Sequence, residues 1–363
     1  MPASPRFRWS HQVDSDGIGG LAATTSRVLV TGRDTLDRLD VIQCLDAGTG
    51  KEIWRHSYVA EGNLDYGNSP RATPLVHNDH VFTLGAFGHL CCLELETGFV
   101  AWQRNLAGEF AAADLVWGHS GSPLIADGKL IVQPGGADAS LVALDPETGD
   151  TIWSSSGRAA SYSSFMPVEI DGVTQLVGLD SHSLGGWNPE NGERLWSIIP
   201  PHGGDFNVAT PLITGQRIIV TSENNGTRLY EFGGRGMIHT EPLAVSEELA
   251  PDTHTPVIVS GWVIGGWNGL VGLKLDDNFS TTTRIDEDSL NGYSSMIAGP
   301  DRVLALTESG LLLLIAVDDD SLSITARLKL ARENPYVLAH PALVNEALYL
   351  RIGNGIHRLD LPK

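Results

Sequence analysis

A tandem repeat limits what this chain can fold into more than any other feature of its sequence. One phrase recurs four times, as Leu45–Trp54, Leu93–Trp102, Leu144–Trp153 and Trp187–Trp196. Each copy reads as a strand, a tight turn that ends in Gly, and a second strand with Trp four residues after that Gly. Glycine suits the positive φ of such turns, and an indole is a large apolar plate that can pack between neighbouring sheets. Recurrence of one unit at a fixed period predicts a repeat architecture.

A second phrase sets the period of the repeat. Small or polar residues precede a proline and an aliphatic pair, and a turn with an alternating strand follows. The prolines are Pro74, Pro123, Pro167, Pro211 and Pro256, at intervals of 49, 44, 44 and 45 residues. A divergent copy at the start, one after Pro256 and one at Pro341 bring the total to eight antiparallel units of four strands. The sequence therefore predicts an all-β fold, an eight-bladed β-propeller.

The two ends of the chain are expected to share one blade. The last unit stops at Lys363 before its Trp strand, whereas the first residues, with Trp9, read as a Trp strand without a blade. Pairing the N-terminal strand with the last blade closes the ring and removes exposed sheet edges. We therefore expect one domain over residues 1–363, with a loop or short helix at 231–252, where the repeat phrase is lost. The predicted blades lie near 18–58, 70–105, 119–156, 163–199, 207–245, 254–285, 293–330 and 337–361, the last completed by residues 6–13.

Tandem units with this pattern resemble the quinoprotein-type (PQQ-like) β-propeller repeat family. The resemblance covers essentially the whole chain and is strongest in the first four blades. The family includes PQQ-dependent alcohol and sugar dehydrogenases and the periplasmic lipoprotein scaffold of outer-membrane β-barrel assembly. The resemblance implies the propeller fold, and it leaves open whether this chain is a scaffold or a dehydrogenase that holds PQQ with Ca²⁺.

The adjacent cysteines Cys91 and Cys92 bear on that choice. The resemblance implies a vicinal disulfide over the quinone in the dehydrogenases. In the repeat, however, Cys92 and Cys44 occupy the position of Ala143, which describes a small buried slot in a strand. We therefore expect buried free thiols and predict no bound cofactor, with PQQ and Ca²⁺ kept as the alternative.

The charge balance and the hydropathy pattern exclude two classes of partner. Lys and Arg total 24 against 44 Asp and Glu, a net charge of −20, which repels phosphate backbones and predicts no nucleic-acid partner. No apolar run reaches the roughly 20 residues of a membrane span. The N-terminus has no apolar stretch of the kind a secretory leader carries. The chain as written is therefore expected to be cytoplasmic with free cysteines, or periplasmic or secreted if a leader was removed.

Candidate functional residues lie in the loops that enter each innermost strand and in those between the second and third strands. In a propeller these loops open on one face around the central channel, and loops on rigid β-scaffolds often carry function. They are rich in Tyr, His, Asn and Asp. The candidate ligand-binding residues are His119, His254, His340, Arg71, Tyr162, Asn207, Asp252, Trp267, Asn268 and Tyr293.

Three of these candidates are histidines close to the proline of their blade. His119, His254 and His340 can each direct an imidazole at one axis, as a metal site or an acid–base pair requires. Alternatively, each histidine caps a loop or hydrogen-bonds the backbone of a neighbouring blade. Aromatic side chains on the same loops can stack on a ring; these are Tyr162, Tyr293, Tyr336, Trp117 and Trp267.

Two functions follow as hypotheses. The first is a binding or scaffolding propeller that recognises a protein partner or a carbohydrate-like ligand on its loop face, at the central channel. The alternative is an enzyme with its site in the channel mouth. That enzyme is either a PQQ/Ca²⁺-dependent oxidoreductase or a metal-assisted or acid–base sugar-active enzyme.

Overall fold

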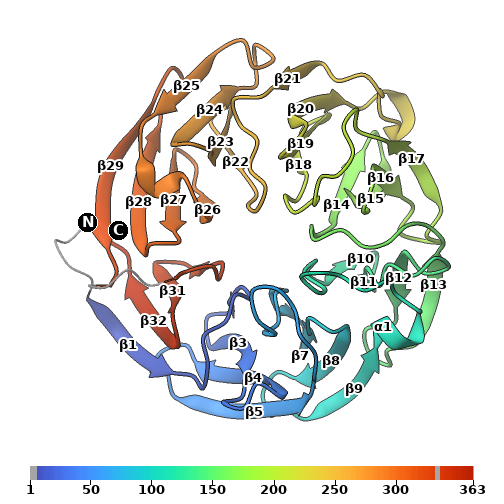
Figure 1. Cartoon of the computed structure of the whole chain (residues 1–363), viewed down its shortest axis with the longest axis vertical. Coiled ribbons are helices and arrows are strands. Elements are labelled where there is room, and N and C mark those ends of the chain that lie inside the picture. Colours follow the sequence, from blue (N-terminus) through green and yellow to red (C-terminus); the bar gives the residue numbers. More distant parts are fainter. Residues whose placement is uncertain (1–5, 332–335, 363) are drawn as a thin grey trace. The chain divides into compact units, whose positions relative to one another are not determined.

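Eight four-stranded antiparallel sheets make up this protein (Figure 1). The computed structural model describes residues 6–331 and 336–362. These residues form two compact units with four sheets each: a terminal unit of residues 6–160 and 336–362, and a middle unit of residues 161–331. The sheets are the blades of an eight-bladed β-propeller, which confirms the fold predicted from the repeats.

In the blades β2–β5 and β10–β13 of the terminal unit, the second and third strands are almost wholly buried, because both of their faces pack against other sheets. The outermost strands β5 and β9 alternate over most of their length between more exposed and less exposed residues. One four-residue helix, α1 (Leu106–Glu109), follows β9. The strands of the four blades are β2 (Ala22–Ala23), β3 (Arg27–Arg33), β4 (Leu39–Asp46) and β5 (Glu52–Val59); β6 (Leu75–His77), β7 (His80–Leu84), β8 (His89–Glu94) and β9 (Val100–Asn105); β10 (Leu124–Ala126), β11 (Lys129–Val132), β12 (Leu141–Leu144) and β13 (Thr151–Ser155); and β30 (Ala342–Val344), β31 (Ala347–Ile352) and β32 (Gly355–Asp360) with β1 (Phe7–Gln12).

The middle unit repeats the same four-stranded plan. Its strands are β14 (Met166–Ile170), β15 (Val173–Leu179), β16 (Leu184–Trp187) and β17 (Arg194–Ile198); β18 (Leu212–Thr214), β19 (Arg217–Ser222), β20 (Gly226–Glu231) and β21 (Ala244–Ser246); β22 (Val257–Val259), β23 (Trp262–Gly266), β24 (Leu270–Lys274) and β25 (Thr282–Ile285); and β26 (Ser294–Ala298), β27 (Arg302–Thr307), β28 (Leu311–Val317) and β29 (Leu322–Lys329). Two 3₁₀ turns, η1 (Gly234–Gly236) and η2 (Asp288–Leu290), lie between strands. Among the residues that the structure describes, no helix is long and apolar enough to cross a membrane.

The N-terminal strand completes the last blade, as predicted. β1 pairs antiparallel with β32, and Ser10 lies opposite His357 in the ladder. The completed blade then packs on the first blade through a shared apolar cluster that includes Leu21, Val28, Tyr349 and Ile356. This pairing leaves β1 as the outermost strand of its sheet, the place that the Trp strand holds in the other repeats.

The repeated tryptophans pack between blades of the terminal unit, as the repeat predicted. Each ring lies over the turn glycine of the next blade, and a Cβ added to Gly98 would lie 2.5 Å from the ring of Trp54. Gly98 has a φ of +72°, so the turn favours glycine for its backbone conformation as well as for the space it leaves. Each indole N–H also donates to a carbonyl of that turn: Trp9 to Ala47 at 3.0 Å, Trp54 to Leu95 at 2.8 Å and Trp102 to Pro146 at 3.0 Å.

The segment 231–252 departs from the repeat, as expected from its sequence. The 3₁₀ turn η1 interrupts it, and an isolated bridge joins Phe232 to Ile238. The outermost strand of this blade, β21, is only three residues long and contains no Trp. A loop excursion therefore replaces the Trp strand in the blade of β18–β21.

The cysteines occupy the buried slot that the repeat alignment predicted. Cys44 and Cys92 have no exposed surface, and each lies opposite the Trp of its blade, as does the equally buried Ala143. All three cysteines, including Cys91, are free thiols. Burial raises the pKa of each thiol to about 12, so none is a thiolate at neutral pH.

Candidate functional site

A pocket of about 570 Å³, here pocket A, opens in the terminal unit. Its walls come from residues 14–18, the β3–β4 turn and the loop that enters β6, with Tyr336 and Leu338 on the remaining side. Two of the lining side chains are exposed aromatic rings, Tyr66 at 57% and Tyr336 at 59%. Tyr66 has a φ of +63°, which is uncommon for a bulky residue and indicates a specific loop conformation. Pocket A is therefore a polar cavity with an aromatic rim.

A buried ion pair supports the floor of pocket A. Arg33 donates to Asp40 at 2.7 Å through Nη1 and to the Asp37 carboxylate at 2.7 Å through Nε. The phenol of Tyr58 also donates to Asp40, at 2.9 Å. Burial raises the pKa of Asp40, although Arg33 and Tyr58 both oppose that shift. Asp37 in turn accepts a 2.6 Å hydrogen bond from Asn68, so the ion pair fixes the loop that carries Tyr66.

A second cavity of about 470 Å³, pocket B, adjoins the same loop. Residues 63–65 line pocket B, and the residues that follow them line pocket A. The other walls are mostly apolar and include Phe87, Leu115 and Val116. His119, one of the candidate histidines, closes the inner side of this pocket.

His119 is buried and neutral. It is only 5% exposed, and its ring hydrogen-bonds the backbone of Gln133. Burial lowers the pKa of His119 to about 4, so its imidazole carries no charge at pH 7. The backbone that His119 contacts belongs to its own blade, and not to a neighbouring blade as the sequence hypothesis had it.

The stability of the protein is expected to fall on mild acidification because of His119. An unfolded histidine has a pKa of about 6.5, so between pH 6.5 and 4 the unfolded chain binds more protons and unfolding is favoured as the pH falls. From pH 7 to pH 5 this single group is expected to remove about 2 kcal/mol from the free energy of unfolding. Urea titrations of the parent and His119→Asn at both pH values measure the difference, and the variant should lose about 2 kcal/mol less.

The exposed His239 provides the matched control. The variant His239→Asn should follow the parent at both pH values. If His119→Asn also follows the parent, His119 is not the group responsible.

The other terminal-unit candidates stabilise loops. Arg71 donates to the carbonyls of Asp65 at 2.9 Å and Gly67 at 2.6 Å, and so holds the loop between pockets A and B. Burial lowers the pKa of Arg71 to about 10. His340 is exposed, and its Nδ1 lies 3.0 Å from the carbonyl of Pro341.

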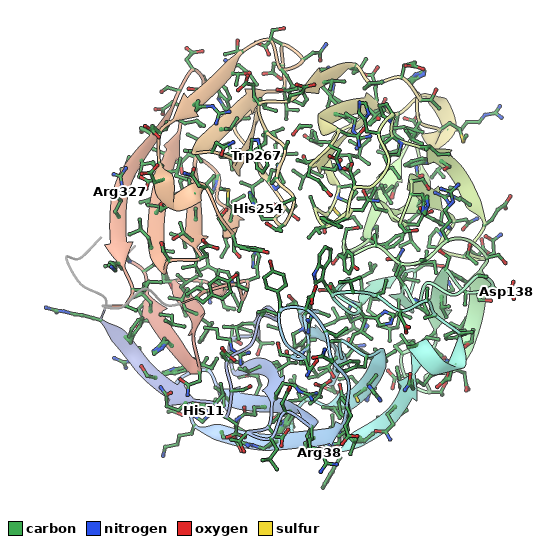
Figure 2. All side chains as sticks on the ribbon, viewed as in Figure 1. His11, Arg38, Asp138, His254, Trp267 and Arg327 are labelled. Atoms are coloured by element: carbon green, nitrogen blue, oxygen red, sulfur yellow. The ribbon has the colours of Figure 1, made fainter. Side chains whose placement is uncertain are left out.

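Two of the middle-unit candidates belong to one region of the blade β22–β25 (Figure 2). Burial lowers the pKa of His254 to about 4, against the opposing effects of the Gly266 backbone and the Asp252 carboxylate. Trp267 packs on the apolar cluster around Val263 and Leu273.

Asn268 follows Trp267 in the same blade, whereas Asn207, Tyr162 and Tyr293 belong to other blades. Asn268 is exposed and has a φ of +51°. The guanidinium of Arg284 donates a 2.8 Å hydrogen bond to the backbone carbonyl of Asn268. Asn207 is buried and donates to the carbonyl of Asp180 at 3.0 Å. Tyr162 and Tyr293 are half-buried, and the backbone N–H of Tyr293 lies 3.3 Å from the Glu308 carboxylate. Most of these polar groups are thus engaged in holding loops.

The donor groups needed for a PQQ–Ca²⁺ site are not gathered in this protein. Ca²⁺ takes six to eight oxygen ligands. Within residues 6–331 and 336–362, no group of three or more His, Cys, Asp or Glu side chains is placed to hold a metal ion. Cys91 and Cys92 are free and buried in β8, away from any loop. We therefore assign no reaction step to that cofactor.

Tyr66 and the floor of pocket A were not among the predicted site residues. Tyr336 was predicted only as an aromatic side chain that could stack on a ring. The sequence does contain one indication that Tyr66 lies in a tight loop. Gly67 follows it directly, and a Tyr-Gly pair ahead of the repeat's proline is typical of such a loop. The buried pair of Arg33 and Asp40 leaves no such signal, because charged residues seven positions apart are common.

Comparison with known proteins identifies the repeat. The PQQ_2 family, described as outer membrane protein assembly factor BamB, matches residues 37–232. The quinoprotein alcohol dehydrogenase PedH of Pseudomonas putida is 27% identical over 169 residues, which cover 44% of this chain and 27% of PedH. The chain thus matches about a quarter of the length of that relative.

Solved structures share the fold at low sequence identity. The quinohemoprotein alcohol dehydrogenase of Comamonas testosteroni has a TM-score of 0.65 at 12% identity, covering 99% of this chain and 78% of that one. The computationally designed Ika8 protein has a TM-score of 0.66 at 10% identity, covering 97% and 98%. An enzyme and a designed protein thus resemble the structure of this chain to the same degree, so these similarities show the fold alone. The family match covers more than half of the chain, and the protein therefore belongs to the PQQ_2 propeller family, that of outer membrane protein assembly factor BamB.

Proposed function

We propose that this protein is a binding propeller that recognises a basic, extended segment of a partner protein across pockets A and B. One observation carries the proposal: two adjoining pockets in one unit share a loop, and exposed tyrosines rim the larger one. Aromatic side chains at the edge of a pocket are typical anchors of protein interfaces. The match to the family of an assembly factor supports a protein partner.

The charge of the pocket walls supports a basic partner. Asp14, Asp16 and Asp34 line pocket A, and Asp65 and Asp114 line pocket B. The whole chain carries a net charge of −20, which attracts a cationic segment. Exposed apolar side chains between and beside the pockets, Leu36 and Val116, provide contacts for the aliphatic residues of such a segment.

A labelled peptide tests this proposal directly. The probe is a short fluorescent peptide of alternating Lys and Leu, and fluorescence anisotropy measures its Kd. We expect binding that weakens as salt rises, and a Kd about tenfold higher for the double variant Tyr66→Ala/Tyr336→Ala, because that variant removes both aromatic anchors.

Two controls accompany the measurement. Phe99→Ala removes an equally exposed aromatic ring from the β8–β9 turn and should leave the Kd unchanged. A peptide with Glu in place of Lys should not bind. Equal affinity for both peptides, or an unchanged Kd in the double variant, would contradict the proposal. Binding of neutral oligosaccharides that requires both tyrosines would instead assign pocket A to a carbohydrate ligand.

A further inference from the structure

Arg228 differs from the other buried arginines of this protein in having almost no partners. Three arginines are buried in the described ranges. Arg33 is paired with carboxylates, and Arg351 donates to the carbonyls of Thr31 at 2.6 Å and Ser15 at 2.9 Å. Arg228 makes one hydrogen bond to another described residue, at 3.3 Å to the Ser222 hydroxyl. Its Nε is buried and unpaired, and no carboxylate of the described chain lies within ion-pair distance.

The position of Arg228 makes this arrangement costly. Arg228 lies within β20, between Val220 of β19 and Val245 of β21, and is 5% exposed. The equivalent ladder positions of three other blades hold the buried, neutral residues Cys91, Val142 and Val271. Burying a charge without a partner costs several kcal/mol, and an apolar side chain would avoid that cost. The guanidinium of Arg228 therefore has a donor that no described residue satisfies, and it can bind an anion from outside the chain.

Arg228 is one of the residues that line a cavity of about 330 Å³, here pocket C. The phenol of Tyr230 lines the same cavity and makes no hydrogen bond to another described residue. The rest of the lining is mixed, with apolar side chains that include Ile198 and Val245 beside the polar side chains of His202 and Asn224. The volume lies at the lower end of the range for small-molecule sites.

The loop that borders pocket C is held in place from within the unit. Asn225 accepts a 3.0 Å hydrogen bond from the His202 N–H and donates back to the His202 carbonyl at 2.8 Å. The same amide donates to Asp205 at 2.5 Å. Pocket C is therefore a formed cavity, so binding there needs little ordering of the loop.

We propose that pocket C binds a small aliphatic or aromatic monocarboxylate, with its carboxylate against Arg228 and its apolar body along Ile198 and Val245. A guanidinium matches a carboxylate through two parallel N–H donors, and Tyr230 can supply a third donor. Glu241 and Glu247 also line the pocket, so a doubly charged anion such as sulfate or hydrogen phosphate is repelled more strongly than a monocarboxylate. This site is separate from pockets A and B and does not depend on the function proposed for them.

Titration with a series of carboxylates tests the proposal. The probes are acetate, butyrate, hexanoate and benzoate at millimolar concentrations, measured by calorimetry and by thermal stabilisation of the full chain. We expect binding that strengthens from acetate to hexanoate as apolar surface is buried, and no binding of hexanamide or inorganic phosphate. Arg228→Met should abolish the thermal stabilisation and raise the Kd at least about tenfold.

The variants separate binding from folding. Arg228→Met replaces an unpaired buried charge with an apolar chain of similar length, so it is expected to fold at least as stably as the parent. Arg302→Met alters an exposed arginine of the same unit and should bind hexanoate as the parent does. The proposal is overturned if no member of the series binds, if phosphate binds as well as hexanoate, or if Arg228→Met retains binding.

Discussion

Asp40→Ala is expected to lower the free energy of unfolding by about 3–5 kcal/mol, measured by urea denaturation. Asp40 has no exposed surface, and Arg33, its partner at 2.7 Å, is 4% exposed. Removing the carboxylate leaves the guanidinium buried with a single remaining carboxylate, Asp37. It also removes the acceptor of the Tyr58 phenol. The loss is large because the buried guanidinium loses its only fully buried counter-ion among the described residues and keeps only the partly exposed Asp37 carboxylate.

Two further variants distinguish that explanation from a general loss of structure. The double variant Asp40→Ala/Arg33→Met removes both charges and should recover most of the stability lost in the single variant. Asp301→Ala breaks an exposed ion pair with Arg302 and should cause no measurable change. A double variant as unstable as Asp40→Ala would show that packing, and not charge, accounts for the loss.

Much of the fold could be predicted from the sequence, because the same pattern of a turn glycine followed by a strand tryptophan recurs in several blades. In the blades with Trp54, Trp102 and Trp153, the Gly of the turn and the Trp that follows it can be aligned by eye. The closing strand was predictable for the same reason, since Trp9 stands alone at the start of the chain. The segment 231–252 could be marked only as an interruption, because a loop excursion leaves no periodic pattern to interpret.

The sites were harder to predict than the fold. The loops that enter the innermost strands were predicted to carry function, but the side chains chosen from them mostly hold the loops themselves, as Arg71 does in the terminal unit and Asn207 in the middle unit. Arg228 could not be chosen from sequence, because an arginine in a strand is ordinarily exposed. Its burial and its lack of a partner depend on neighbouring strands and on distant loops, which only the folded chain brings together.

Trp262 explains how the second half of the chain keeps its blades together after the repeat phrase is lost. Its indole donates to the carbonyl of Asp318 at 3.1 Å, in the β28–β29 turn of the next blade. Trp9, Trp54 and Trp102 bond the equivalent turns from the outermost strands of their blades, whereas Trp262 does so from the second strand. The contact between blades is preserved while the position of the Trp within the repeat changes.

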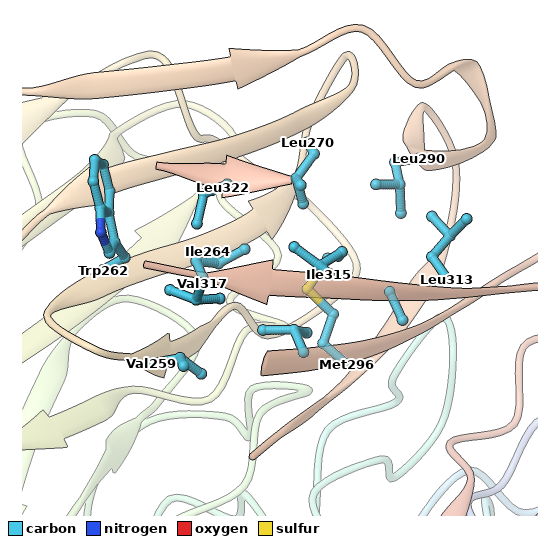
Figure 3. Packing of buried hydrophobic residues seen from close by; sticks show 12 residues of the cluster. Val259, Trp262, Ile264, Leu270, Leu290, Met296, Leu313, Ile315, Val317 and Leu322 are labelled. Carbon is cyan, nitrogen blue, oxygen red and sulfur yellow. The ribbon is translucent and has the colours of Figure 1, made fainter. Parts of the chain in front are cut away.

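Trp262→Ala is therefore expected to lower the free energy of unfolding by about 3–5 kcal/mol, since it empties a fully buried site in the cluster of Figure 3. Trp262→Phe keeps most of the apolar contact with Val259 and Leu322 but removes the hydrogen bond to the carbonyl of Asp318, an exposed residue, which should cost about 0.5–1.5 kcal/mol. Urea titrations measure the free energy of unfolding of both Trp262 variants, and the loss should be larger for Trp262→Ala than for Trp262→Phe. The exposed Phe99→Ala is the control. Equal losses in the two Trp262 variants would mean that the hydrogen bond to the next blade, and not the filled volume, holds these two blades together.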